Sequence, residues 1–478
     1  MPKRVAVIDL GSNSARMAIF ERTSRLGFYI LREFKTKVRL GEGAYEHGGV
    51  LQKAAMDKVF AAFAEFREFI RLYGVRKVIC AGTSALRDAP NGDVFIARVS
   101  RELGLNLRVI DGKTEAFLGG IAALNLLSPF GEATTIDIGG GSTELARIKD
   151  GRIVETLSLD LGTVRLKELF FDKKDPAGAA KFADKLIATI PESFRNSNLI
   201  AIGGSARAIS SAIMQLKNHP LKLVHNYIYD FAEQRKFIEK LAYAGVLELK
   251  NFPVKKDRYD TIREGAMIFA KVCAALGGKL VFTSGAGVRE GLFLSSLLRP
   301  GVKFPQNFNP SVKSLTDRFA VRQNSLIVSH ARAIFAALSP LHGLDEKYLR
   351  SLVIAAKLCN LGRSLGFYSE QSHSAYIVRG GLNYGFTHEE RALIAAIIEN
   401  AGRENVDFGP CAPLLPNAKI VRWLSFMLAA ARWLSVCPQA RFEFLERALH
   451  ISGAKNFVMV KENVKKLPKP EIFAVTFD

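Results

Sequence analysis

Two stretches of the chain place an acid at the end of an apolar run, followed by small and hydroxyl residues. They are IDLGSNS at 8–14 and IDIGGGSTE at 136–144. Glycine has no Cβ, so the backbone can approach a ligand closely, and successive N–H groups in such turns bind anionic oxygens. The acids Asp9 and Asp137 suit a divalent metal, usually Mg²⁺, that bridges carboxylate and phosphate. The pattern therefore predicts two phosphate-binding turns with a metal ion between them.

Similar turns follow three other expected strands, at 82–84, 203–205 and 283–287. In open α/β sheets, ligands bind outside the carboxyl ends of strands, so all five turns would open into one cleft. Arg87, just after the first of these turns, suits bidentate contact with phosphate. Its alternative role is a salt bridge in a surface loop. Arg39 and Arg289 are weaker candidates of the same kind and could instead form structural ion pairs.

Two further carboxylates could act as a general base. Glu115 lies at the start of an expected helix, where it could activate water for attack on a phosphoryl group. In general, an acid in the first turn of a helix is at least as common as a partner of the helix dipole. Glu144 is the second candidate, and its alternative is a solvated strand residue. Asp9 and Asp137 could likewise be ordinary turn acids at strand ends.

The elements that must position these residues follow one order, and that order occurs twice. Each half opens with three short strands in a meander and continues with helices and further strands, as hydrophobic periodicity and turn residues indicate. The expected strands lie at 5–9, 17–20, 28–31, 75–81 and 107–110, then at 134–137, 143–148, 152–158, 199–202 and 280–282. The sequence therefore predicts a duplicated α/β fold with a cleft between two lobes.

From about residue 300 the pattern becomes mostly helical. Helices are expected at 326–338, 346–358, 388–399 and 423–434, and alternating apolar residues at 457–460 and 472–477 predict a small sheet at the end. We therefore expect three domains, at 1–128, 129–300 and 301–478.

The chain has 478 residues and a net charge of +21. This length exceeds one hydrophobic core, and the charge favours a polyanionic partner. The five cysteines are scattered without a C-x-x-C pair, which is typical of a reducing, cytoplasmic compartment. No apolar run is long enough for a membrane span, and no recognised nucleic-acid-binding motif occurs. We therefore expect neither a membrane nor a nucleic acid as partner.

Taken together, the motifs at 8–14, 82–87, 114–116, 137–144 and 203–205 resemble the exopolyphosphatase / guanosine pentaphosphate phosphohydrolase (Ppx/GppA) family. That family belongs to the actin–hexokinase–Hsp70 superfamily. The resemblance implies two ribonuclease-H-like, actin-like lobes with an interlobe cleft. It also implies dependence on Mg²⁺, a homodimer, and removal of terminal phosphate from inorganic polyphosphate to release orthophosphate.

The resemblance also implies roles for individual residues. Glu115 and Asp137 match the catalytic acids, and Asp9, Asp137 and Glu144 match the acids near the metal. The residues that match phosphate-binding positions are Gly11, Ser12, Asn13, Ser14, Thr83, Ser84, Arg87, Gly139, Gly140, Gly141, Ser142, Thr143, Gly203, Gly204 and Ser205.

The C-terminal region resembles the helical, HD-related domain of longer family members, with His330 and the stretch 373–376 fitting that pattern. Where the metal-binding His-Asp pair should fall, the sequence has Cys359-Asn360. This pair does not supply an imidazole beside a hard-oxygen acid. We therefore expect a non-catalytic domain that adds basic surface to a channel for the polyanion and could supply a dimer contact.

Three alternatives to polyphosphate hydrolysis stay open on the sequence. The first is hydrolysis of the 5′-phosphate of pppGpp in the same cleft. The second is a sugar kinase or ATPase of the same superfamily, although no clear signal for a nucleotide base pocket is visible. The third is a non-enzymatic sensor of polyphosphate or (p)ppGpp, against which the presence of both Glu115 and Asp137 argues.

Overall fold

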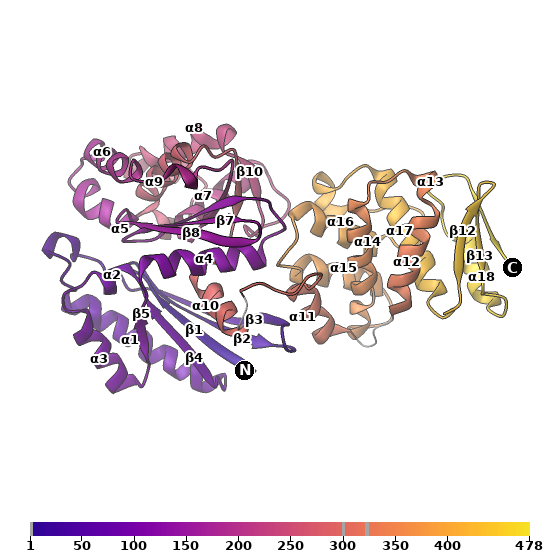
Figure 1. Cartoon of the computed structure of the whole chain (residues 1–478), viewed down its shortest axis with the longest axis horizontal. Helices are drawn as coiled ribbons and strands as arrows, with labels where there is room; N and C mark the ends of the chain where they lie inside the picture. Colours follow the sequence, from indigo (N-terminus) through magenta and orange to yellow (C-terminus); the bar gives the residue numbers. More distant parts are fainter. Residues whose placement is uncertain (1–2, 299–301, 321–324) are drawn as a thin grey trace. The chain divides into compact units, whose positions relative to one another are not determined.

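A computed structural model describes residues 3–298, 302–320 and 325–478. The chain divides into two compact units, Met1–Phe308 and Asn309–Asp478. The first unit contains two β-sheets with helices around them, and the second is mostly helical with a small sheet near its end (Figure 1). The mixed α/β architecture with two sheet-containing lobes and a helical C-terminal region agrees with the fold class expected from the sequence.

The first sheet has five strands in the order β3-β2-β1-β4-β5. The first three pair antiparallel, which confirms the predicted meander, whereas β1, β4 and β5 run parallel. The bounds are β1 Arg4–Leu10, β2 Ser14–Arg22, β3 Phe28–Lys37, β4 Lys77–Gly82 and β5 Leu107–Val109.

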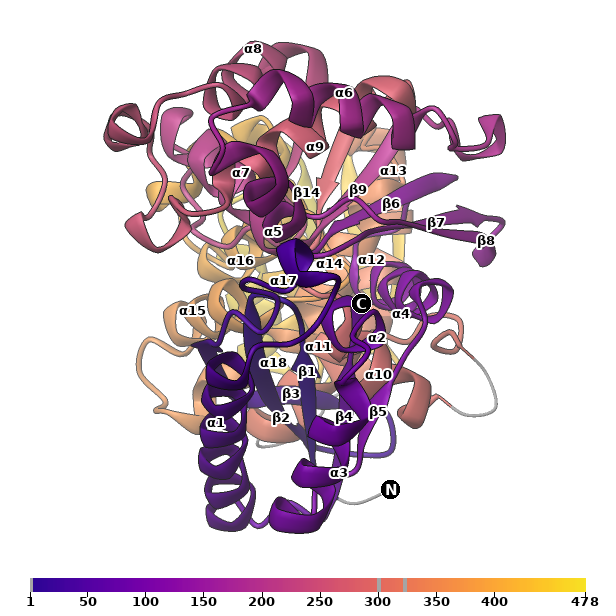
Figure 2. The ribbon, with the colours of Figure 1, turned by 90° about the vertical axis from the view of Figure 1, so that its left-hand side faces the viewer.

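Helices cover both faces of this sheet. On one face, α1 (Lys53–Leu72) and α3 (Gly92–Leu103) share a core with alternate residues of β1, such as Ile8 (Figure 2). On the other face lies α10 (Val288–Leu297), whose Phe293 ring stacks on Phe20 with 4.2 Å between ring centroids. The helix α10, which covers this face of the first sheet, therefore comes from 129–300, the stretch that the sequence assigns to the second lobe.

The second sheet has six strands in the order β10-β11-β9-β6-β7-β8 and repeats the strand arrangement of the first. An antiparallel meander, β6-β7-β8, is followed by β9 and β11, which run parallel to β6 and to each other. The bounds are β6 Ala133–Ile138, β7 Thr143–Lys149, β8 Arg152–Leu159, β9 Asn198–Ile202, β10 Ile228–Asp230 and β11 Leu280–Thr283.

Helices and short turns complete this unit, and α6, α8 and α9 lie on the outer side of the second sheet (Figure 1). The helices are α2 Ser84–Arg87, α5 Thr163–Leu166, α6 Pro176–Ile187, α7 Gly203–Leu216, α8 Phe231–Ala242 and α9 Ile262–Ala275. A π-helical turn spans Lys167–Phe171, and 3₁₀ turns span Tyr45–His47, Glu192–Phe194, Val246–Asn251 and Lys256–Arg258.

One helix, α4 (Gly112–Leu126), lies between the two sheets (Figure 1). It packs against β7 and β8 on one side and α10 on the other. Small residues permit this fit: a Cβ on Gly120 would lie 2.9 Å from Cδ1 of Ile153. Packing on both sides fixes the position of α4. Its first turn therefore holds Glu115 in the space between the lobes.

The second unit is a helical bundle built around the buried Trp423, closed by a three-stranded sheet, β12-β13-β14. Its helices are α11 Pro310–Phe319, α12 Ser325–Ala337, α13 Ser339–His342, α14 Lys347–Leu358, α15 Glu370–Gly381, α16 His388–Glu399, α17 Ala418–Leu434 and α18 Val458–Lys466. The strands are β12 Arg441–Leu445, β13 Ala448–Ser452 and β14 Ala474–Phe477, and 3₁₀ turns span Leu361–Ser364 and Gly409–Leu414.

The strand predicted at 457–460 is wrong, because α18 begins there. Val460 and Val464 are the buried residues of this helix, one turn apart, while Val458 and Met459 are exposed. The apparent alternation is thus one turn of a helix with a narrow apolar face. The final strand, predicted at 472–477, is confirmed at Ala474–Phe477.

The region resembling an HD domain contains packed histidines. His330 is buried and its Nε2 lies 3.1 Å from the carbonyl oxygen of Cys437, and His388 is also buried. Cys359 is buried where the metal-binding His would fall. Within the described ranges, no group of three or more His, Cys, Asp or Glu side chains is arranged to hold a metal ion. No described helix is both long and apolar enough to cross a bilayer.

Glu264 on α9 is a buried acid that is not among the residues predicted for the site. It is 0% exposed, neither carboxylate oxygen has a hydrogen-bond partner among the described residues, and Nη2 of Arg263 is 3.9 Å away. Burial raises the pKa of Glu264 to about 7. A raised carboxyl pKa means that the folded state binds the proton more tightly, so stability is lost as pH rises toward 7.

We therefore predict that Glu264→Gln stabilises the chain relative to wild type more at pH 8.5 than at pH 5. The pKa shift corresponds to a difference of about 3 kcal/mol in the free energy of unfolding. Urea denaturation of both chains at the two pH values measures it. Glu65→Gln, on the exposed side of α1, is the matched control. Equal effects of Glu264→Gln at both pH values would contradict titration of this side chain.

Candidate active site

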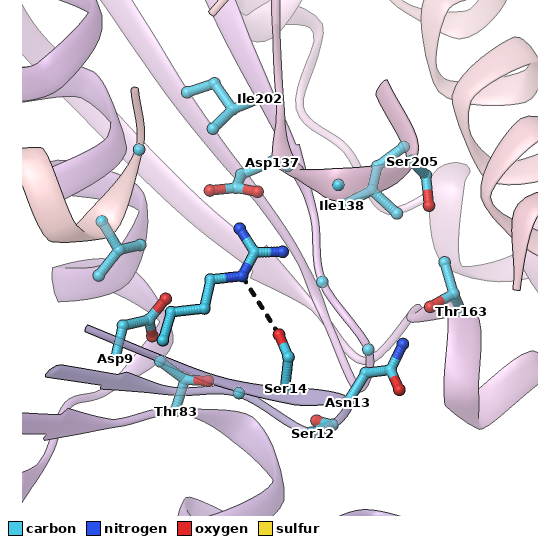
Figure 3. A pocket seen from close by; sticks show the side chains of 18 of the residues that line it. Asp9, Ser12, Asn13, Ser14, Thr83, Asp137, Ile138, Thr163, Ile202 and Ser205 are labelled. Atoms are coloured by element: carbon cyan, nitrogen blue, oxygen red, sulfur yellow. Dashed lines mark hydrogen bonds between the residues drawn. The ribbon is translucent and has the colours of Figure 1, made fainter. Parts of the chain in front are cut away.

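A cavity of about 350 Å³ lies between the two sheets of the first unit, at the carboxyl ends of β1, β4, β6 and β9 (Figure 3). Most of the residues predicted for the site line it. They are Asp9, Gly11, Ser12, Asn13, Ser14, Thr83, Ser84, Glu115, Asp137, Gly139, Gly140, Ser142, Gly203, Gly204 and Ser205. The turn after β11 contributes Gly287 and the residues next to it on α10.

The two principal turns have the same backbone geometry. In the first, the N–H of Gly11 donates to the carbonyl oxygen of Ser14 at 3.1 Å. In the second, the N–H of Gly139 donates to the carbonyl oxygen of Ser142 at 2.9 Å. The similar spacing in sequence thus produces the same hairpin turn in each lobe, and the two turns face one cavity.

The turns from the two lobes press closely together. A Cβ on Gly140 would lie 2.7 Å from Cβ of Ser12, whose Oγ lies 3.2 Å from Oγ of Ser84 within the first lobe. A Cβ on Gly141 would lie 2.2 Å from the hydroxyl of Tyr45. Glycine is therefore needed at these positions because the opposite lobe occupies the space of a side chain.

Further contacts join the lobes beside the cavity. The N–H of Gly43 donates to Oε1 of Glu168 at 2.8 Å, and Arg165 lies over the ring of Tyr45 at 4.6 Å. Arg165 also pairs with Asp88, with 3.1 Å between Nη2 and Oδ2. These contacts connect the first lobe to the start of the helical segment after β8.

Of the four predicted acids, Asp9, Glu115 and Asp137 line the cavity, and Glu144 lies near Glu115 outside the lining. Asp9 and Asp137, at the ends of β1 and β6, point into it from the two lobes (Figure 3). Glu115 is 9% exposed and Glu144 is 1% exposed. The predicted alternative of a solvated strand residue is therefore wrong for Glu144, because α4 and β8 pack against β7.

Burial raises the pKa of all four acids, and their mutual repulsion adds to the effect for most of them. The pKa of Asp137 rises to about 6 and that of Glu144 to about 8, in each case chiefly through burial. The pKa of Glu115 is raised well above its usual range by burial and by the carboxylates of Glu144, Asp137 and Asp9. Arg87 opposes this rise, with its Nη1 3.5 Å from Oε2 of Glu115.

Four predicted site residues lie outside the described lining of this cavity: Arg87, Gly141, Thr143 and Glu144. Oγ1 of Thr143 donates to the carbonyl oxygen of Leu161 at 2.5 Å, and Oε1 of Glu144 accepts from Oγ of Ser158 at 2.9 Å. Arg87 contacts Glu115, and Gly141 is covered by Tyr45. These residues support the lining rather than form its surface.

Sequence reasoning missed most of the cations in the cavity. The lining contains Arg16, Lys35, Lys37, Arg207, Arg258 and Arg289, of which the sequence singles out only Arg289, as a weak candidate. Strand register places Arg16 opposite Lys35 and Ser14 opposite Lys37, so these side chains share one face of the sheet. Nε of Arg16 donates to Oγ of Ser14 at 3.2 Å, drawn as the dashed line in Figure 3. In the sequence, residues two positions apart on β2 and β3 lie on the same face of the sheet. This spacing could have predicted that Arg16, Lys35 and Lys37 face the cavity.

These cations and acids shift one another's pKa values and form ion pairs. Burial together with Arg258 and Arg16 lowers the pKa of Lys35 to about 8. Arg16 and Arg289 in turn offset part of the rise in the pKa of Asp9. Arg289 forms ion pairs with Glu33 at 2.8 Å and with Glu290 at 3.5 Å. Arg39 pairs with Glu42 and Asp260 and is not among the lining residues.

The donor set of the cavity fits Mg²⁺ chemically. Mg²⁺ usually keeps several waters and is held by one or two carboxylates together with substrate phosphates. Asp9 and Asp137 supply two carboxylates in one cavity, beside hydroxyl groups and glycine backbone that can hold phosphate. Such a site needs no cluster of three protein ligands, so the magnesium site stays a prediction. The cavity as a whole suits binding of phosphate oxygens beside a basic carboxylate.

Comparison with known proteins agrees with this geometry. Residues 18–300 match the model of the Ppx/GppA phosphatase family, and residues 309–410 match the model of Ppx/GppA phosphatase, domain III. A protein of Pseudoalteromonas translucida (strain TAC 125), named guanosine-5'-triphosphate,3'-diphosphate pyrophosphatase, is 28% identical over 445 residues. These residues are 89% of this chain and 86% of that protein.

Solved structures give the same result. An Aquifex aeolicus member of the Ppx/GppA family is 28% identical with a TM-score of 0.53, over 62% of this chain and 98% of that chain. An exopolyphosphatase from Cytophaga hutchinsonii, 23% identical with a TM-score of 0.58, shares the fold over 63% of this chain and 100% of that chain. The turns, the acids and these matches lead to one conclusion: this chain belongs to the Ppx/GppA phosphatase family and is a hydrolase of phosphoanhydride bonds.

Proposed function

We propose that this chain is an exopolyphosphatase, which removes the terminal phosphate of inorganic polyphosphate and releases orthophosphate. The observation that carries the proposal is the composition of the cavity. Six Lys and Arg side chains line it, and no aromatic side chain is among its described lining residues. A linear chain of phosphates needs cations along its length, whereas a nucleotide base usually binds against apolar or aromatic side chains.

The proposed chemistry is attack of water on the terminal phosphoryl group. The backbone N–H groups of the turns at 11–14, 139–142 and 203–205 hold the phosphate oxygens, and Arg16 and Arg207 add positive charge. Such positioning and charge stabilisation provide most of the catalysis in phosphoryl transfer. Mg²⁺, held by Asp9 and Asp137 with Glu144 behind them, would supply further neutralisation of the phosphate charge.

Glu115 is the proposed general base. A base works best when its pKa lies near the working pH, and burial among other carboxylates raises the pKa of Glu115. In this proposal Glu115 takes a proton from the attacking water, and the contact with Arg87 fixes the orientation of its carboxylate. Asp137 helps to position the water. The bond from the terminal phosphorus to the bridging oxygen breaks, and the shortened polyphosphate leaves.

A second candidate is hydrolysis of the 5′-phosphate of pppGpp in the same cavity. It is favoured by the name of the relative from Pseudoalteromonas translucida, which matches 89% of this chain. The turns and acids would act in the same way, because the scissile bond is again a terminal phosphoanhydride. The two candidates differ only in the group that enters the cleft behind the terminal phosphates.

We predict that Glu115→Gln lowers kcat for orthophosphate release from long-chain polyphosphate by about 10²- to 10⁴-fold, because the amide cannot accept the proton. Removal of Mg²⁺ with a chelator is expected to abolish release by the wild type. Colorimetric detection of orthophosphate measures both effects. Glu65→Gln is the matched control and should keep wild-type activity. A near-normal rate for Glu115→Gln would exclude Glu115 as the base.

The substrate is decided by direct competition. We expect kcat/KM to be higher for polyphosphate than for pppGpp, and higher for long polyphosphate than for short, because longer chains meet more of the cations in the cleft. Assays of a polyphosphate length series beside pppGpp, at one salt concentration, measure this. A higher kcat/KM for pppGpp would replace the first candidate by the second.

A substitution at Gly162 tests how much activity depends on the position of the turn at 139–142. A Cβ on Gly162 would lie 2.3 Å from the carbonyl oxygen of Gly140 and 2.4 Å from the carbonyl carbon of Gly141. These are backbone atoms, which cannot move away without shifting the turn itself. Gly162 does not line the cavity, so its substitution acts on the turn from behind.

We predict that Gly162→Ala lowers kcat/KM for orthophosphate release by at least about tenfold, because a misplacement of about 1 Å costs up to 10²-fold. Gly131→Ala is the control: a Cβ there meets no atom within 4 Å. Thermal unfolding of both variants separates a local shift of the turn from loss of the fold. Wild-type activity of Gly162→Ala would show that the position of this turn is not critical.

A further inference from the structure

The second unit contains a cavity of its own, of about 360 Å³, which no part of the proposed mechanism uses. It lies beyond the end of α16, beside the first turns of α17 and the segment 467–470 at the end of α18. Three cations, Arg403, Arg422 and Lys469, line it together with one acid, Glu404. Its lining residues all belong to the second unit, so it is separate from the cavity between the two sheets.

A buried hydroxyl in this cavity has no partner. Ser425 lines the cavity and is only 3% exposed, yet its Oγ makes no hydrogen bond to any described residue. Ser425 is three residues after Arg422 on α17, so both side chains lie on the same face of the helix. A buried polar group without a partner costs about 1–3 kcal/mol. A ligand that accepts from this hydroxyl would remove that cost.

The cations differ in how far they are already engaged. Nη2 of Arg403 donates to Glu399 at 3.2 Å and to Oγ of Ser372 at 3.0 Å. Nζ of Lys469 donates to the carbonyl oxygen of Lys465 at 3.0 Å. Arg422 is exposed and makes no hydrogen bond or ion pair with the described residues. Its guanidinium is thus available to an incoming anion, and its planar fork matches phosphate oxygens.

We propose that this cavity binds a phosphate group, with Arg422 and Ser425 as its principal contacts and Arg403 and Lys469 as supporting charges. The walls include Phe426 and Leu467. The volume is at the small end of ligand pockets, which suits a compact anion. The group can come from free inorganic phosphate or from one unit of a polyphosphate chain, since both present the same oxygens. The proposal does not rest on the proposed catalytic function.

The two tryptophans of the chain give a local readout. Trp423 and Trp433 both lie on α17, and Trp423 immediately follows Arg422. Fluorescence excited at the tryptophan band therefore reports on this helix and not on the cavity between the two sheets. We expect titration of the full chain with inorganic phosphate, without Mg²⁺ and at constant ionic strength set with KCl, to give a saturable change in tryptophan emission. Phosphate should also raise Tm.

Three variants of the full chain decide the assignment. Arg422→Ala is expected to weaken phosphate binding at least tenfold, whereas Arg332→Ala, which removes an exposed arginine from α12, should bind like wild type. Ser425→Ala is expected to bind more weakly without losing stability in the absence of phosphate, because it removes a hydroxyl that has no partner. If Arg422→Ala fails to fold, Arg422→Gln takes its place.

The Glu115→Gln chain distinguishes free inorganic phosphate from polyphosphate as the ligand, because this variant is expected not to consume polyphosphate. Saturation by inorganic phosphate assigns a site for the free anion, and saturation by polyphosphate alone assigns a contact for the chain. The proposal is overturned if neither ligand gives a saturable change in the emission of the wild type, whatever happens to Tm, because phosphate in the cavity between the two sheets can raise Tm by itself. It is also overturned if the change survives in Arg422→Ala, or if KCl alone reproduces it.

Discussion

The close contact between two glycine turns is the constraint on which the first unit depends. Ser12 of one lobe sits where Gly140 of the other would carry a side chain, and Tyr45 covers Gly141 in the same way. Because the backbones meet at this distance, acids that end strands of two different sheets share one small cavity. A Cβ at either glycine would require the lobes to move apart, and the acids would separate with them.

This contact creates an electrostatic problem that the surrounding residues only partly solve. Four carboxyl groups lie close together, and burial is the largest cause of the raised pKa of each. Buried charges are tolerated when they are paired, and Arg16, Arg207 and Arg87 provide partial compensation. The same burial lowers the pKa of Arg16 and Arg207. A site with unneutralised acids and cations side by side is suited to a metal ion and a phosphate chain arriving together.

The second unit has a different character. The position expected for a metal-binding His-Asp pair is filled by Cys359 and Asn360, and His330 is packed in the core. Its polar features lie elsewhere, around Arg422 and Ser425 on α17. In our proposal this helical domain binds an anion without a metal pair, between one face of α17 and the segment 467–470.

The sequence by itself determined the turns, the acids at the ends of β1 and β6, the order of the elements and hence the family, because each is a local pattern of glycine, acid and hydroxyl residues. It could not determine which cations face the cavity. Lys35 and Lys37 look like a solvated strand edge until the register with Arg16 is known, and Arg207 and Arg258 come from distant elements. Nor could it show that α10 returns to the first sheet or that Glu144 is buried. These facts depend on contacts between residues far apart in the chain, and only the packing of the tertiary structure decides such contacts.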